Sequence, residues 1–174
     1  MYKSVYQCNV INEQKEKNFQ EALAYVPYVF DDIRSFKSAM DRNDYNTAVA
    51  EAEQIGEKSL KAIAKKNGKL SSTMQHKKGH DLSYLATECG SKIVASKDEL
   101  KFLTDGYFKA RYPDGKKKYT KEEAEYGGKT ACNLADKMIE ELDISNSDIC
   151  KELGEVDDVK NIGDLSIWNR IMNK

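Results

Sequence analysis

Apolar residues recur every three or four positions along most of the chain, which is the spacing of amphipathic α-helices. The first stripe consists of Phe19, Leu23, Val26, Phe30, Ile33, Phe36 and Met40. Pro27 falls inside this stripe, so the helix is either kinked there or begins near it. No segment alternates apolar and polar residues at period two. The pattern therefore predicts an all-α protein.

Capping signals divide the following segment into two helices. Asp44 is the expected N-cap of a helix that ends at Asn67-Gly68, since both of these residues tolerate the left-handed conformation of a helix C-cap. A polar loop then runs to His80. The shorter helix that follows has an apolar face made of Leu82, Leu85, Ala86 and Cys89.

Two capping boxes, Ser96 to Glu99 and Thr120 to Glu123, open two longer helices. In a capping box a hydroxyl and a carboxylate satisfy backbone donors that the helix leaves unpaired. The first helix must end near Arg111, because Pro113 disfavours helical geometry at the residue before it. In the second helix, Gly127-Gly128 permits close packing of a neighbouring helix.

After Ser145 the chain is acidic and less regular, and a last short helix is predicted from Asp164 to Ile171. Short connections favour antiparallel neighbours, so we predict an up-and-down antiparallel bundle of about five main helices. We assign residues 1–145 to a single helical domain and residues 146–174 to an acidic C-terminal extension.

Composition fits one soluble domain, since 174 residues with 40% hydrophobic and 33% charged side chains can form a core. No run approaches ~18 apolar residues, so we expect no membrane span. The N-terminus lacks the features of a signal peptide, and we expect a cytoplasmic protein. Cys8, Cys89, Cys132 and Cys150 form no CxxC pair, so we expect reduced thiols that mostly pack in the core.

The net charge of −1 conceals an uneven distribution of charge. Residues 58–80 contain seven lysines and no acid, and residues 109–121 contain five lysines and Arg111 against Asp114 alone. Residues 136–158 reverse the balance, with nine acids and two lysines. The basic stretches are either an anion-binding face or two solvated, lysine-rich helix ends.

Signatures of catalysis are scarce. The chain has no GxxxxGK[ST], GxGxxG, HExxH or GxSxG motif, and we assign no catalytic residue and no cofactor. His76 and His80 are four residues apart, a spacing that could hold a metal on a helix. Gly79 lies between them in a loop-like stretch and we find no second ligand cluster, so we predict no metal site.

Two stretches suit phosphate. Residues 77–82, KKGHDL, form a basic loop that enters a helix, whose N-terminus offers free N–H groups. Residues 107–115, YFKARYPDG, end a helix with an arginine and two tyrosines, which suit phosphate binding and base stacking. The alternative is local: Arg111 pairs with Asp114 to cap the helix while the tyrosines pack.

Three motifs, in this order, carry a family resemblance. The first is a helix of residues 50–63 that contains Glu57-Lys58-x-x-Lys61-Ala62, and the second is His80-Asp81-Leu82 with Leu85. The third is Tyr107 followed by Ala110-Arg111-Tyr112-Pro113-Asp114. Their order and spacing resemble the HEPN domain (higher eukaryotes and prokaryotes nucleotide-binding) over roughly Ala39 to Leu142.

The resemblance implies a helical bundle that often forms a homodimer and binds nucleotides or RNA. Many HEPN proteins are encoded beside a minimal nucleotidyltransferase and act as its partner, often in toxin–antitoxin or defence systems. We therefore expect a nucleotide or RNA as ligand, bound in a basic groove between the His80 loop and the Arg111 turn.

The family motifs and the basic loop indicate which residues form the site. Those assigned to nucleotide or phosphate binding are Lys58, Lys61, Lys78, His80, Tyr107, Arg111 and Tyr112. Those assigned to structural support are Glu57, Asp81, Pro113 and Asp114. Lys61 and Arg111 would neutralise phosphate, and Tyr107 or Tyr112 would stack on a base. His80 would donate a hydrogen bond or cap its helix.

The ribonuclease branch of the family carries an arginine followed, after four to six residues, by a histidine. The arginines of this chain are Arg34, Arg42, Arg111 and Arg170, and none has a histidine at that spacing. We therefore favour binding without catalysis over a ribonuclease toxin. The remaining alternative is a dimeric adaptor that docks a nucleotidyltransferase or another partner.

Overall fold

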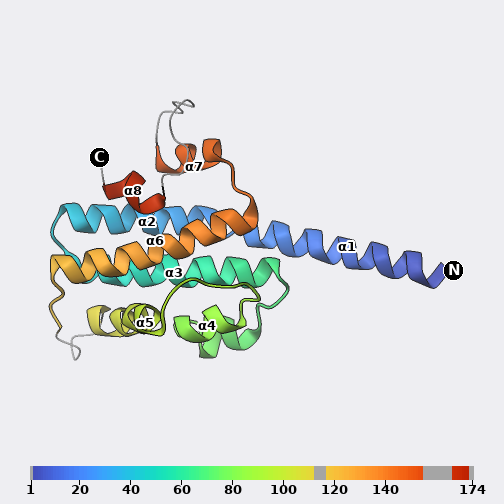
Figure 1. Ribbon diagram of the computed structural model, residues 1–174, viewed down its shortest axis with the longest axis horizontal. Coiled ribbons are helices and arrows are strands. Elements are labelled where there is room, and N and C mark those ends of the chain that lie inside the picture. Colours follow the sequence, from blue (N-terminus) through green and yellow to red (C-terminus); the bar gives the residue numbers. More distant parts are fainter. Residues whose placement is uncertain (1, 112–116, 155–165, 173–174) are drawn as a thin grey trace.

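The computed structural model describes residues 2–111, 117–154 and 166–172, with side chains from residue 12 to residue 110 in the first range. Its helices are α1 (Tyr2–Leu23), α2 (Val26–Asp41), α3 (Tyr45–Lys66), η1 (Thr73–Lys77), α4 (Leu82–Glu88), α5 (Lys97–Arg111), α6 (Lys121–Leu142), α7 (Asn146–Leu153) and α8 (Ile167–Met172). These ranges contain no strand, and the predicted all-α helical bundle is confirmed (Figure 1).

Helix α3 is the centre of the bundle. It packs against α1, α2, α4, α5 and α6, and most extensively against α6 and α2. Figure 1 shows that α3 runs back along α2, while α6 begins at the same end of the bundle as α3 and runs in the same direction. Side chains on several sides of α3 are therefore buried, including Ala52, Ile55, Leu60 and Ile63.

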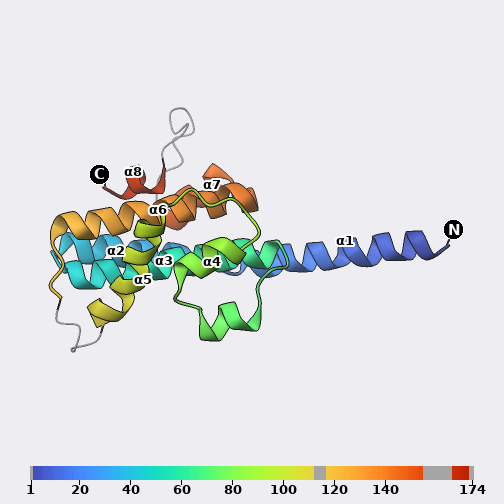
Figure 2. The same ribbon diagram turned by 60° about the horizontal axis from the view of Figure 1, so that its bottom comes forward.

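The stripe that contains Pro27 belongs to two helices. Helix α1 ends at Leu23 and α2 begins at Val26, so Pro27 lies in the first turn of α2. Proline is tolerated there because the first N–H groups of a helix have no partner within it. The helix therefore begins near Pro27 and is not kinked by it. The N-terminal part of α1 extends beyond the bundle (Figures 1 and 2).

The predicted helix ends are confirmed by their hydrogen bonds. Asp44 accepts a hydrogen bond from the Thr47 amide at 3.2 Å, and Gly68 after α3 has a φ of +65°. At the starts of α5 and α6, the hydroxyl of each box accepts from a backbone amide and the glutamate accepts from the N-cap amide.

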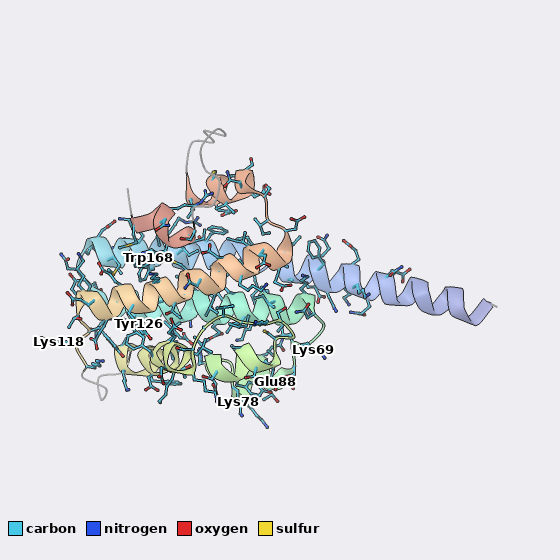
Figure 3. The ribbon with its side chains drawn as sticks, viewed as in Figure 1. Lys69, Lys78, Glu88, Lys118, Tyr126 and Trp168 are labelled. Atoms are coloured by element: carbon cyan, nitrogen blue, oxygen red, sulfur yellow. The ribbon has the colours of Figure 1, made fainter. Side chains whose placement is uncertain are left out.

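The glycine pair of α6 permits close packing, as predicted. A Cβ added at Gly128 would overlap the ring of Phe36 in α2 and would lie 2.8 Å from Trp168 Cζ3 in α8 (Figure 3). At Gly127 it would lie 3.0 Å from Phe102 in α5. Three helices thus approach α6 where it has no side chains.

Two elements were not predicted. A single π-helical turn, η1, interrupts the polar loop before His80. Helix α7 lies in the segment predicted to be irregular, with Ser145 as its N-cap and buried Ile149 and Cys150 on its inner side. At two turns it is too short to show a clear period. Helix α8 overlaps the predicted last helix, ends one residue beyond it at Met172, and packs on α6.

The three cysteines with described side chains, Cys89, Cys132 and Cys150, are buried free thiols, as expected. Burial raises the pKa of Cys132, which keeps this thiol protonated and unreactive. Among the described residues, no helix has the length and apolar character needed to cross a membrane.

Candidate functional site

Three charged residues of α3 are buried together on one side of the helix. Glu53, Glu57 and Lys61 follow one another at intervals of four residues, so they lie one turn apart. Their exposed fractions are 0%, 7% and 9%. Charged side chains are rarely buried unless they are paired; Glu53 and Glu57 contact His80 across the bundle, and Lys61 pairs with Glu57. We call Glu53, Glu57, Lys61 and His80 the polar cluster.

The contacts of the polar cluster converge on one nitrogen of His80. His80 Nδ1 lies 3.0 Å from Glu53 Oε1 and 2.5 Å from Glu57 Oε2. The Lys61 ammonium donates to Glu57 Oε1 at 2.5 Å. Glu57 thus pairs with Lys61 through Oε1 and faces His80 through Oε2, and its assignment to structural support stays a prediction. Such pairing offsets the desolvation of the buried charges.

The backbone around Gly79 positions His80. A Cβ at Gly79 would lie 3.1 Å from Lys61 Nζ and 3.2 Å from the carbonyl oxygens of Met74 and Gln75, so a side chain there would crowd the cluster. Immediately after His80, Asp81 caps α4 by accepting a hydrogen bond from the Tyr84 amide at 3.0 Å. This contact fixes the start of the helix that follows His80.

An aromatic group covers the other side of His80. The His80 ring stacks on Tyr107 of α5, with centroids 4.0 Å apart and planes at 17°. Phe108 meets both rings edge-on, at 6.2 Å from His80 and 5.2 Å from Tyr107. Phe108 is 49% exposed, which makes it one of the few large apolar side chains on the described surface. The ring orientation of His80 is thereby fixed from two directions.

The lysines assigned to phosphate binding occupy different places. Lys58 reaches α2 and pairs with Asp32 at 2.5 Å, apart from the polar cluster. Burial raises the pKa of Asp32, although the hydrogen bond from Lys58 opposes that shift. Lys78 is exposed, and its ammonium lies 4.5 Å from the centroid of the Tyr84 ring (Figure 3). The structure therefore links Lys61 to His80 only through Glu57, which contacts both, while Lys58 pairs with Asp32 instead.

The Arg111 turn lies at the limit of the described residues. Arg111 is the last residue of α5, where the sequence predicts the helix to end, and its side chain is outside the described part. Tyr112, Pro113 and Asp114 are outside it entirely. Arg111 is one helical turn beyond Tyr107, so its backbone stands next to the turn of α5 that carries the aromatic group.

A cavity of about 600 Å³ opens between α4 and α5. Near His80 its wall includes Asp81 and Thr104. Further along α5 the wall includes two acids and two lysines, which are Asp98, Asp105, Lys97 and Lys101. Burial alone would raise the pKa of Asp105, but hydrogen bonds from Lys109 and Lys101 lower it. Acids and lysines are mixed in this wall, so the cavity is not itself the predicted basic groove.

The polar cluster also contains a set of metal donors. Glu53, Glu57 and His80 each offer one ligand atom, and these three atoms lie within 4.8 Å of one another. His76 is exposed on η1. The sequence interpretation that no ligand cluster accompanies the histidines is thus wrong for His80, because its two acidic neighbours lie 23 and 27 residues away along the chain.

Comparison with protein families gives one match. The family model described as HEPN domain matches residues 30–142. The chain belongs to the HEPN domain family. This match spans α2 to α6 and includes the whole polar cluster, while α1, α7 and α8 lie outside it. Membership of the HEPN family indicates a function related to nucleotides or RNA. Comparisons with curated proteins and with solved structures give no match.

Two residues of this candidate site, Glu53 and Phe108, were not predicted from the sequence. Glu53 belongs to the polar cluster. Its signal in the sequence is an acid one helical turn before Glu57, with apolar residues close by at Ala52 and Ile55. Phe108 carries the exposed aromatic surface, and its signal is its place between Tyr107 and two basic residues. Neither signal identifies the partner residue, because that contact depends on the fold.

Proposed function

We propose that this HEPN protein binds the phosphate of a nucleotide or an RNA on the surface around His80, without catalysing a reaction of its own. One observation carries the proposal: His80 is clamped between two buried carboxylates and the Tyr107 ring, beside the exposed ring of Phe108. A fixed polar ring next to an exposed aromatic suits a ligand with a charged end and a base.

The exposure of each side chain indicates which residues can touch the ligand. Lys78 is exposed and Arg111 closes α5, so these two supply the positive charge for phosphate. Phe108 offers a stacking surface for a base, because one face of Tyr107 is taken by His80. Lys61 is buried against Glu57, and it therefore holds Glu57 in place without touching the ligand.

Tyr112 keeps the stacking role that the family motif implies, and Pro113 and Asp114 keep their assignment to structural support. Lys58 has no role in this site, since it is engaged with Asp32 on α2. Binding without catalysis is proposed because no arginine of the chain is followed by a histidine at the spacing of the ribonuclease branch.

The test is a binding titration of the full chain. Fluorescence anisotropy with a labelled single-stranded RNA, and calorimetry with ATP, would be run at two salt concentrations. We expect Arg111→Ala to weaken binding by about 1.5–3 kcal/mol, as for a hydrogen bond to a charged group. Affinity should also fall with rising salt, because phosphate contacts release counterions.

Lys121→Ala is the matched control, since Lys121 is exposed at the start of α6, where it pairs with Glu125. This variant should bind like the unchanged chain. Equal affinity of Arg111→Ala and the unchanged chain, with both folded by circular dichroism, would remove the proposed site. Absence of saturable binding to both ligands would overturn the proposed function as a whole.

A second candidate function is association with another protein, and the shape of α1 favours it. The N-terminal part of this helix extends beyond the bundle, where it is available to a second copy or to a minimal nucleotidyltransferase of a toxin–antitoxin or defence system (Figure 2). Light scattering of the full chain is expected to give a dimer, and deletion of residues 2–11 to give a monomer. A full chain that is monomeric at micromolar concentration and binds no nucleotidyltransferase would contradict this role.

A further inference from the structure

The geometry of the polar cluster points to a binding site for one divalent transition-metal ion, formed by Glu53, Glu57 and His80. We infer that Zn²⁺ binds there more tightly than Mg²⁺ or Ca²⁺. This inference concerns the ion alone and does not depend on binding of a nucleotide.

The distances suit a common ion. Metal–ligand bonds to histidine nitrogen and carboxylate oxygen are about 2.0–2.2 Å, so the ligand atoms of a tetrahedral site lie roughly 3.2–3.6 Å apart. His80 Nδ1 lies 3.0 Å from Glu53 Oε1 and 2.5 Å from Glu57 Oε2. The His80 side chain is 37% exposed, so the ring can move outward by the small distance that an ion requires.

One oxygen of the cluster lacks a donor. Glu57 Oε2 is buried and accepts no hydrogen bond, although it faces His80 Nδ1. The other oxygen, Glu57 Oε1, already accepts from Lys61. His80 Nδ1 carries at most one hydrogen, and its contact with Glu53 Oε1 has hydrogen-bond geometry. A buried acceptor without a donor is unfavourable, and a cation beside Glu57 Oε2 would remove that cost.

The surrounding residues hold the three ligands in place. Gln54 donates to Glu53 Oε2 at 2.7 Å, and Lys61 donates to Glu57 Oε1, the oxygen that does not face His80. Tyr107 fixes the plane of the His80 ring. Partners of this kind orient the ligands of protein metal sites and raise their affinity. Three protein ligands also leave a fourth position of a tetrahedral ion open, as in catalytic zinc sites.

The donor types determine the choice of ion. Imidazole nitrogen suits zinc and its transition-metal neighbours, whereas Mg²⁺ and Ca²⁺ prefer oxygen ligands alone. Affinity for a mixed nitrogen and oxygen site also rises from Mn²⁺ towards Zn²⁺. We therefore expect Mn²⁺ to bind more weakly than Zn²⁺, and Mg²⁺ to bind more weakly still.

The experiment measures Zn²⁺ binding to the full chain after treatment with a chelator. Calorimetry is expected to show one ion per chain, and His80→Ala and Glu53→Gln are each expected to weaken binding by about tenfold or more. His76→Ala is the matched control, since it removes the exposed histidine of η1 and should bind like the unchanged chain. Mg²⁺ titrated alone should give no saturable heat at the same concentration.

Zinc also binds thiolates, so a second measurement identifies the ligands. Co²⁺ bound to the full chain should show a visible spectrum of nitrogen and oxygen ligation, without the charge-transfer band of a thiolate. Cys8→Ser, which removes the N-terminal thiol, should leave both the stoichiometry and the spectrum unchanged.

The two measurements decide the inference even where a ligand variant does not fold. Failure of the unchanged chain to bind Zn²⁺ stoichiometrically would overturn it. A thiolate band for bound Co²⁺, or equal Zn²⁺ affinity of His80→Ala and the unchanged chain, would overturn it as well. One ion per chain with nitrogen and oxygen ligation, lost in His80→Ala or in Glu53→Gln, would support it.

Discussion

Two buried contacts of this bundle are alike in depth and opposite in chemistry. Around Gly128, the rings of Phe36 and Trp168 fill the space that a missing side chain leaves. In the polar cluster, Glu53 and Glu57 are as deeply buried, but they contact a lysine and a histidine. The first contact is explained by the apolar area that it removes from water.

The second contact has no such explanation. Burying paired charges gains little stability over apolar residues of the same volume, because the desolvation cost cancels much of their attraction. Glu53, Glu57 and Lys61 are buried like core residues, so we expect an apolar row at these positions to support the fold about as well. The comparison leads us to expect that the Gly128 contact serves stability and the polar cluster serves function, and the first three of the following predictions test that division.

The largest effect is expected from breaking the polar cluster on one side. Glu57→Ala leaves the buried Lys61 ammonium without its carboxylate and should lower the free energy of unfolding by about 3–5 kcal/mol. Adding Lys61→Met should recover most of this loss, because the orphaned charge is then gone. Urea denaturation measures both. A double variant as unstable as Glu57→Ala would show that the cluster itself is needed for stability.

A smaller loss is expected where the packing is apolar. Gly128→Ala forces a methyl group into the rings of Phe36 and Trp168 and should lower the free energy of unfolding by about 1–3 kcal/mol. Asn133→Ala is the control, since Asn133 is exposed on the same helix and alanine favours helix there. Thermal melts of both variants compare them. Unchanged stability of Gly128→Ala would mean that α6 is not packed as closely as described.

The exposed aromatic should separate binding from stability. Phe108→Ala is expected to weaken RNA binding by about 1–3 kcal/mol, the contribution of one stacked base, while unfolding changes by less than about 0.5 kcal/mol. Tyr126→Ala is the matched control, because Tyr126 is a similarly exposed ring on α6. Anisotropy titrations with RNA and thermal melts of both variants measure the two effects. If Phe108→Ala and the unchanged chain bind RNA with equal affinity, Phe108 is excluded from the site.

The smallest effect concerns pH and a partly buried ion pair. A hydrogen bond from Lys66 lowers the pKa of Glu141 to about 2, with Lys137 adding to the shift. Because the folded pKa lies below the unfolded value of 4.5, the stabilisation is complete above about pH 4.5 and is lost as pH falls towards 2. Solvent limits its size to about 1 kcal/mol. Denaturation of Glu141→Gln and the unchanged chain should therefore converge in acid, and a constant difference would contradict this sign.

Most of the fold could be predicted from the sequence, because its signals are local. Asp44 and the capping boxes at 96–99 and 120–123 each act within one turn, so spacing alone identifies them. The packing role of Gly127-Gly128 could be predicted in kind, but its partners could not. Helix α7 was missed because two turns leave too few positions to display a period.

The candidate site could be predicted less completely, because its contacts join residues that are distant in the sequence. The motif residues His80 and Tyr107 do meet, yet His80 lies in the turn before α4 and Tyr107 in α5, so their stacking depends on how these elements pack on α3. Glu53 was overlooked because a glutamate within a helix is ordinarily solvated. Only the fold shows that this side of α3 faces His80, 27 residues further along the chain.

The central position of α3 also has a consequence for the order in which the chain folds. Its contact with α2 joins neighbouring segments, whereas its contact with α6 closes a loop that includes α4 and α5. Short loops cost less entropy to close, so we expect α2 and α3 to form an early hairpin and α6 to dock late. Mutations in the hairpin should then slow folding, and mutations such as Gly128→Ala should chiefly accelerate unfolding.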